Sequence, residues 1–170
     1  MVKNTNKMEM NILALIGAAI VPLLVGAVYY GPIFGKSWMN VNGFTEEDLK
    51  GGNMALIFGL SLVFSFMIAL ALSTIVIHQM GFMQILQPLA DAGNTEAKET
   101  FDSLLANYGD VHRSWGHGAL HGAFVTLLFA FPLIAINALF ERRGWKYISI
   151  HTGYWLATLT IMGAIICQFL

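Results

Sequence analysis

The sequence predicts an all-α membrane protein in which four transmembrane helices form a compact bundle, with a short amphipathic helix in the loop between spans two and three. The 170 residues are 56% hydrophobic and 11% charged, whereas an ordinary soluble domain is about 25% charged. Four apolar stretches also lack every Asp, Glu, Lys and Arg, and helices are the form that satisfies the backbone of such stretches in lipid. We therefore expect a single membrane domain over residues 1–170.

Each apolar stretch is long enough, at about 1.5 Å per residue, to cross the roughly 30 Å hydrocarbon layer. Pro22 is expected to kink the first span and Pro32 to end it. The second stretch is longer than a bilayer requires, so we expect it to tilt or to protrude at one end. The predicted spans cover about residues 10–34, 53–80, 115–140 and 147–170.

Polar connections separate the spans, and the longest is an extramembrane loop over residues 81–114. In this loop Thr95 is a candidate N-cap for a helix whose apolar residues share one face; they are Phe101, Leu104, Leu105 and Tyr108. We expect this net acidic helix to lie on the membrane surface or to cap the bundle. In the first connection, Thr45 is expected to cap a second short helix.

Positive residues near the span ends predict the orientation in the membrane. The short connections 35–52 and 141–146 carry five of them: Lys36, Lys50, Arg142, Arg143 and Lys146. The opposite side carries four: Lys3, Lys7, Lys98 and Arg113. By this margin of one residue, the short connections are expected to face the cytoplasm, with both termini outside.

The composition excludes several classes of function. Nine Lys and Arg against ten Asp and Glu, without a basic stripe, argue against nucleic-acid binding. Cys167 is the only cysteine, so the chain can form neither an internal disulfide nor a cage of thiolates around a metal. No phosphate-binding loop, nucleophile motif or pair of intramembrane carboxylates occurs, and we expect no enzyme activity.

Histidines gather near the start of the third span. His117 and His121 are four residues apart and share one helical face, while His78 lies at the end of span two on the same side of the membrane. Together with His112, just before span three, they could hold a divalent metal ion, or two of them could hold a haem axially. Alternatively, they form interfacial hydrogen bonds beside a close helix contact, because Gly118 and Gly122 form a GxxxG motif. Apart from this alternative, no cofactor is expected.

Aromatic and basic residues gather at the opposite membrane face. The candidate ligands for an anionic lipid headgroup or a small anion are Tyr30, Lys36, Arg142, Arg143 and Tyr154. The alternative is an ordinary aromatic belt with cationic anchors. The leading functional hypothesis is therefore a structural or lipid-binding membrane protein, with membrane lipids and a second copy or another membrane protein as partners. A small transporter or channel subunit acting as an oligomer, and a haem- or metal-binding redox protein, are the alternatives.

Several motifs recur in an order that resembles a known family. They are Tyr30-Gly-Pro-x-Phe-Gly-Lys-x-Trp38, Thr45-Glu-Glu-Asp-Leu49, Asn137-x-Leu-Phe-Glu-Arg-Arg143, Gly153-Tyr-Trp155 and Met162-Gly163. This pattern resembles the bacterial integral membrane family catalogued as domain of unknown function seventeen sixty-one. The resemblance implies a four-helix protein of the bacterial inner membrane and supplies no activity. Gly31 departs from the family pattern, which commonly has serine there, and the loop 81–114 is longer than in many members.

Overall fold

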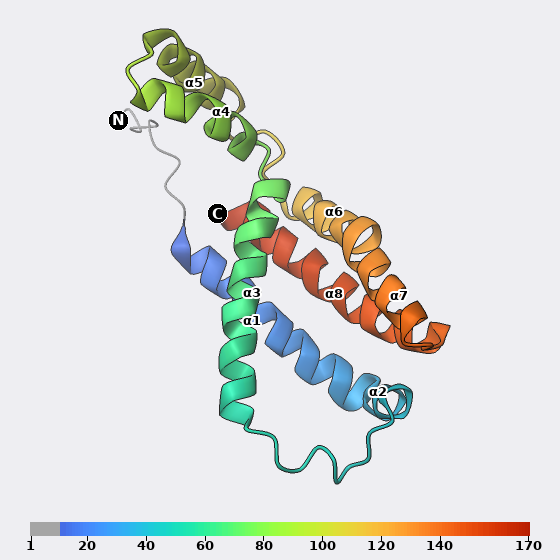
Figure 1. The fold of residues 1–170 in the computed structure, drawn as a ribbon. Helices are drawn as coiled ribbons and strands as arrows, with labels where there is room; N and C mark the ends of the chain where they lie inside the picture. Colours follow the sequence, from blue (N-terminus) through green and yellow to red (C-terminus); the bar gives the residue numbers. More distant parts are fainter. Residues whose placement is uncertain (1–10) are drawn as a thin grey trace.

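The computed structural model describes residues 11–170, which form helices and no strand (Figure 1). The predictions that fall on Met10, Lys3 and Lys7 lie outside the described residues. The α-helices are α1 (Ile12–Val28), α2 (Gly35–Asn42), α3 (Met54–Val76), α4 (Gln79–Asp91), α5 (Thr95–Tyr108), α6 (Trp115–Val125), α7 (Phe131–Phe140) and α8 (Trp145–Phe169). Two π-helical turns, η1 (Tyr29–Ile33) and η2 (Thr126–Ala130), continue α1 and join α6 to α7.

Four helical segments are long and apolar enough to cross a membrane, as the sequence predicts. They are Ile12–Ile33, Met54–Val76, Trp115–Phe140 and Trp145–Phe169. The expected end of the second span near residue 80 is wrong, because α3 stops at Val76 and the buried Ile77 is extended. With 23 residues, α3 is already about 34 Å long, which suffices for the hydrocarbon layer.

The first span ends near Pro32, as the sequence predicts. The helix runs through Pro22, changes to the π-helical turn at Tyr29, and bends at Gly31, whose φ of −93° and ψ of −106° are not helical. Pro32 has no N–H to continue the α-helical ladder, and α2 starts a new helix three residues later. The chain therefore turns away from the first span at this proline, and α2 lies at the end of that span, where it contacts η1 and α8 (Figure 1).

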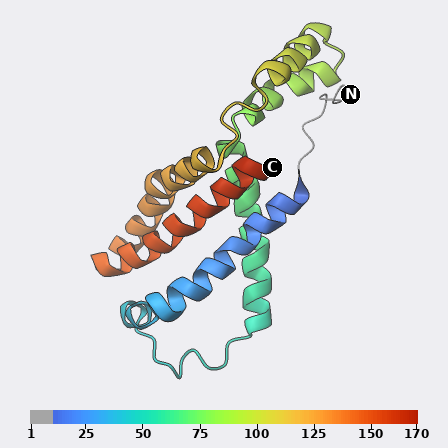
Figure 2. The same cartoon turned by 180° about the vertical axis from the view of Figure 1, so that it is seen from behind.

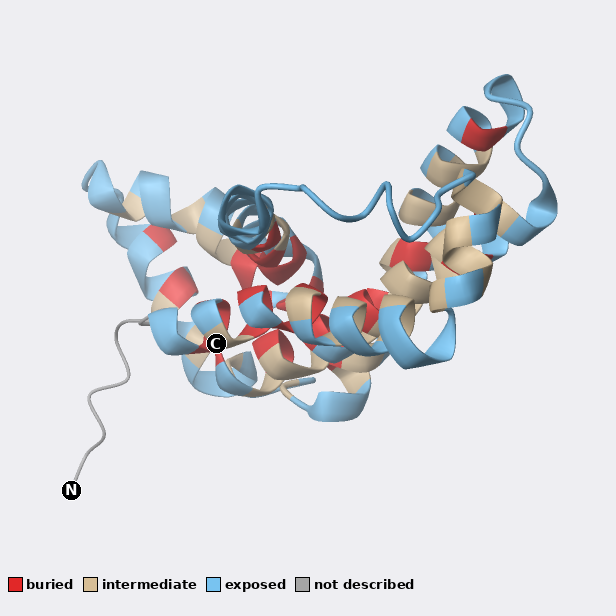
Figure 3. Ribbon diagram, turned by 90° about the horizontal axis from the view of Figure 1, so that it is seen from below, coloured by how far each residue is buried: buried red, intermediate tan, exposed pale blue. Residues whose placement is uncertain are grey.

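Helix α8 lies between α1 and the α6–α7 segment (Figure 2), and α3 crosses α1 and also contacts α8 and α6. The approach of α6 to α8 depends on glycines: a Cβ added at Gly118 would overlap the carbonyl of Gly163, and one at Gly122 would overlap the carbonyl of Leu159. Leu15 and Met162 are fully buried in this core. Figure 3 shows the buried residues along the contacts between helices, while the outer faces are exposed.

The loop 81–114, predicted to lie outside the membrane, contains two helices where one was predicted. The helix of residues 95–108 is present as α5, but its N-cap is Asn94, whose side chain accepts from the Ala97 N–H at 3.0 Å. Its apolar face packs on α4, with the rings of Phe82 and Phe101 6.4 Å apart. The α4–α5 hairpin extends beyond the ends of the spans (Figure 1).

The first connection forms a turn where a second short helix was expected. The Asp48 carboxylate accepts from both the backbone N–H and the hydroxyl of Thr45, at 2.8 and 2.6 Å. These bonds close a turn, and Gly51, with a φ of +128°, directs the chain out of it. The expected helix after Thr45 is therefore wrong, because side-chain bonds within four residues satisfy the backbone instead.

Candidate metal centre

Three imidazoles converge where the spans meet the hairpin. His78 lies in the turn between α3 and α4, and His117 and His121 lie on successive turns of α6. The Nε2 atoms of His78 and His117 are 2.9 Å apart, so one of them donates a hydrogen bond to the other. One nitrogen from each of the three residues lies within 4.8 Å of the other two. The structure thus brings together all three predicted metal ligands.

The first turn of α6 is capped by the residue that precedes it. The Ser114 hydroxyl accepts from the backbone N–H of His117 at 3.3 Å and caps the helix. His117 and His121 are each followed by a glycine that packs against α8. His117 and His121 are therefore held beside the close contact of α6 with α8, on a face of α6 that is turned toward His78.

The turn that carries His78 is fixed by its neighbour Gln79. The Gln79 side chain is 3% exposed, and its Nε2 donates to the carbonyls of Tyr108 and Val111 at 2.9 Å each. These bonds tie the turn before α4 to the segment after α5. His78 is consequently positioned by buried hydrogen bonds, although its own ring is exposed.

A fourth histidine, His112, lies on that segment. Its ring stacks on His117 with centroids 4.9 Å apart and an interplanar angle of 19°, and its centroid is 6.0 Å from that of His78. Its φ of +63° is uncommon for a residue with a Cβ. In this arrangement His112 adjoins the group of three but is not among the residues whose nitrogens converge.

The spacing of the nitrogens suits a metal ion better than a haem. Imidazole binds zinc at about 2.0–2.1 Å, which places two tetrahedral ligands about 3.3 Å apart. Observed separations of 2.9 Å and no more than 4.8 Å differ from this value by amounts that side-chain rotation can supply. A bis-histidine haem needs two nitrogens on opposite faces of a macrocycle, and hydrogen-bonded nitrogens leave no room for the ring between them.

The predicted anion-binding residues only partly converge. Tyr30 and Tyr154 lie together with ring centroids 4.9 Å apart. The Tyr30 hydroxyl lies 3.2 Å from Nδ1 of His151, and the Tyr154 hydroxyl donates to the carbonyl of Pro22 at 3.1 Å. Both phenols are therefore engaged with α1 or α8 rather than directed at an open pocket.

The three cations of that prediction differ in their surroundings. Arg143 donates to the carbonyl of Val41 at 3.2 Å, lies 3.7 Å from the Glu141 carboxylate, and stands over the Tyr147 ring at 5.5 Å. Lys36 and Arg142 are exposed, and neither makes a side-chain hydrogen bond or an ion pair with another described residue. The turn at Arg142 has a φ of +58°.

The hydrogen bond between Tyr30 and His151 was not predicted from the sequence. A signal was present, because Tyr147, His151 and Tyr154 follow the i, i+4, i+7 spacing of one helical face. That face of α8 meets the end of α1 and forms an aromatic cluster at the opposite end of the spans from the metal candidate. Tyr29, Tyr30, Trp38, Tyr147, His151 and Tyr154 make up this aromatic cluster.

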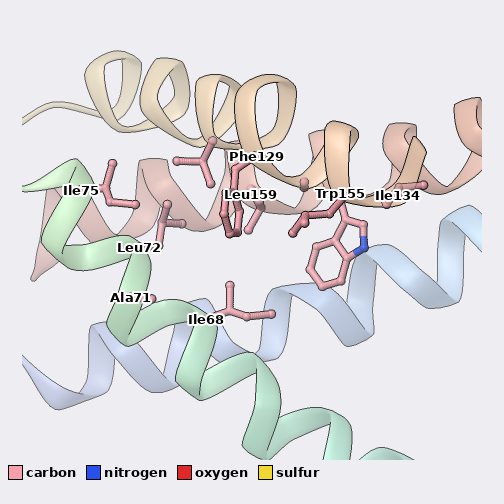
Figure 4. A pocket seen from close by; sticks show the side chains of 11 residues that line it. Ile68, Ala71, Leu72, Ile75, Phe129, Ile134, Trp155 and Leu159 are labelled. Carbon is pink, nitrogen blue, oxygen red and sulfur yellow. The ribbon is translucent and has the colours of Figure 1, made fainter. Parts of the chain in front are cut away.

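An apolar pocket lies between α3, α7 and α8 and was also not foreseen (Figure 4). It measures about 370 Å³, and Ile68, Leu72, Phe129 and Trp155 are among its lining residues. Val125, one helical turn after His121, is also one of its lining residues. Its lining suits hydrocarbon and offers no ligand for a metal or an anion.

Comparison with known proteins identifies the family without supplying a role. No curated protein and no solved structure matched the chain. The model of the family described as "Protein of unknown function (DUF1761)" matches residues 13–167, which include all four apolar segments apart from a few terminal residues. The chain therefore belongs to the DUF1761 family.

Proposed function

We propose that this protein binds a divalent transition-metal ion at one end of its spans through His78, His117 and His121. The observation that carries the proposal is the convergence of three ligand nitrogens within 4.8 Å. His78 is 39 positions from His117 in the sequence, so this convergence is a property of the fold rather than of one helix.

The ligand set favours particular metals. Neutral imidazole suits zinc, copper and nickel, whereas magnesium and calcium prefer oxygen ligands. Three protein ligands leave a fourth position of a tetrahedral ion open to water or to another group. The proposed site therefore takes Zn²⁺, Cu²⁺ or Ni²⁺ and leaves one coordination position accessible.

The test is metal titration of the full chain, purified in detergent without a polyhistidine tag and freed of metal by a chelator. Isothermal titration with Zn²⁺ is expected to give one ion per chain. His117→Ala is expected to weaken binding by at least about 100-fold, since loss of a supporting residue alone costs 10–100-fold. The matched control is His151→Gln, which removes a histidine outside the cluster and should leave the affinity unchanged.

Two results would contradict the proposal. One is the absence of stoichiometric Zn²⁺, Cu²⁺ and Ni²⁺ binding by the wild-type chain. The other is an affinity that falls equally in His117→Ala and His151→Gln, because binding would then not depend on the cluster.

Binding of an anionic lipid headgroup is a second candidate, favoured by Arg142. Its guanidinium is exposed at the connection between α7 and α8 and has no partner among the described residues, so it is free to meet a phosphate. The alternative of a transporter or channel subunit gains no comparable support, because the 370 Å³ pocket within the spans is apolar.

A further inference from the structure

We infer that the metal ion also takes His112 as its fourth ligand and thereby clips the α4–α5 hairpin to the spans. This inference rests on the proposed function, because it assigns the open coordination position of the same site. It goes beyond that function in giving the ion a second role, which is to join two parts of the protein.

The connectivity of the hairpin is the first argument. The chain leaves the spans between α3 and α4 and returns between α5 and α6 (Figure 1). We call residues 77–78 the outgoing linker and residues 109–114 the returning linker. Each linker carries one histidine of the cluster, His78 and His112. An ion held by both, together with His117 and His121 on α6, would cross-link the two linkers to a span.

The packing of the hairpin is the second argument. Within the described residues α5 packs on α4, and α4 meets the spans through its first turns: it contacts α3, Met80 belongs to the buried core, and Met83 packs against that core. Beyond these first turns of α4, the hairpin depends on the two linkers for its position. Gln79, directly after the outgoing linker, donates to the carbonyl of Tyr108 at the end of α5 and to that of Val111 in the returning linker. The two histidines are therefore held near each other before any ion binds.

The conformation of His112 is the third argument. Its backbone is in the left-handed region, and such strain in residues with a Cβ concentrates at ligand clamps and functional sites. Its carbonyl accepts from the Cys167 thiol at 3.2 Å and from the Ser114 N–H at 3.1 Å, which holds the backbone. Its ring is exposed, so it is free to rotate from its stack on His117 toward the ion.

Hydrogen exchange of the full chain, with and without Zn²⁺, tests the inference. At Zn²⁺ concentrations 100 times the dissociation constant, amides that open only when the cluster separates should exchange about 100-fold more slowly. The amides of Val111 and Arg113 report on the returning linker, and those of Met80 and Gly81 report on the outgoing linker; all four are hydrogen-bonded. The amide of Trp38, a residue of the aromatic cluster, donates to the carbonyl of Phe34. This amide is the internal control, and its exchange rate should not change when Zn²⁺ is added.

The variant His112→Asn tests the role of the fourth ligand independently of the other three. Asparagine tolerates a positive φ, so the returning linker keeps its turn without an imidazole. Zn²⁺ should still bind this variant, about tenfold more weakly, and should still protect Met80 and Gly81. Protection of Val111 and Arg113 should be lost.

The outcomes distinguish this inference from the proposed function. If the wild-type chain binds Zn²⁺ but Val111 and Arg113 exchange at unchanged rates, the clip is wrong and the three-histidine site stands. The clip is equally wrong if His112→Asn shows the same zinc-dependent protection as the wild type. If the wild-type chain binds no metal, both proposals are wrong.

Discussion

The two ends of the spans both gather histidine and aromatic side chains, yet they differ in how polar atoms are satisfied. At the end that holds the aromatic cluster, three side chains bond to groups on other segments: Tyr30 meets His151, Tyr154 meets the Pro22 carbonyl, and Arg143 meets the Val41 carbonyl. The Nε2 atom of His151 is buried there without a partner among the described residues. In the histidine cluster the rings meet chiefly one another, through a bond between two imidazoles and a stack.

This difference separates a structural contact from a candidate binding site. Polar groups in lipid stabilise a fold when each finds a complementary partner. Each neutral imidazole offers one lone pair on its unprotonated nitrogen, and a cation that accepts a lone pair from several such nitrogens is a suitable complement for the group. The aromatic cluster thus joins α1 to α8, whereas we propose that the histidine cluster binds a metal ion.

The largest effect should come from separating the helix that carries the histidines from α8. Gly118→Val places side-chain atoms where the Gly163 carbonyl and Cys167 lie, and such overpacking is expected to cost about 3 kcal/mol in the free energy of unfolding. Reversible unfolding in mixed detergent micelles measures it, and metal affinity should fall with it. Gly116→Ala is the control, since a Cβ there has no neighbour within 4 Å. Equal stability of the two variants would mean that α6 does not depend on this contact.

A smaller effect is expected from the aromatic cluster, and on stability alone. Tyr154→Phe removes the hydroxyl that donates to the Pro22 carbonyl, which should lower the free energy of unfolding by about 1 kcal/mol. The same unfolding assay measures this loss, and zinc titration should give an unchanged affinity. A drop in metal affinity in this variant would show that the two clusters are coupled. That result would contradict the separate roles given to the two clusters.

Lipid binding at the aromatic end should respond to Arg142 more modestly. Arg142→Ala removes an exposed cation, and each such charge near an anionic surface contributes about 1 kcal/mol, which is about a fivefold change in affinity. Retention of fluorescent phosphatidylglycerol by the purified protein measures it. Lys98→Ala, on the hairpin, is the control that should not respond. Identical retention by the two variants would count against the headgroup site.

The smallest effect concerns the turn between α2 and α3. Hydrogen bonds from the Thr45 hydroxyl and N–H lower the pKa of Asp48 below its usual value. The stabilisation linked to this shift is present above the pKa of the unfolded chain and is lost as the pH falls through the pKa of the folded state. Thr45→Ala should raise the pKa of Asp48, and an NMR titration of the carboxyl carbon measures the change. An unchanged pKa would show that the turn does not form in the micelle.

The sequence predicted the spans well because hydropathy and the absence of charge are local properties. It also placed His78, His117 and His121 together, since helical spacing and a shared membrane side are readable from the chain. It did not predict α4 or the break at Ile77, because the hydrogen bonds of Gln79 to residues about 30 positions away decide where α3 ends. The engagement of Tyr30 by His151 likewise depends on how α1 and α8 pack, which no local pattern contains.

The most direct measurement of the central claim is X-ray absorption at the zinc edge on the detergent-solubilised chain loaded with one equivalent of Zn²⁺. The account predicts a first shell of nitrogen at about 2.0–2.1 Å, with the outer-shell scattering of at least three imidazoles, and a loss of one imidazole in His121→Ala. A first shell dominated by oxygen, or a spectrum that His121→Ala leaves unchanged, would contradict it.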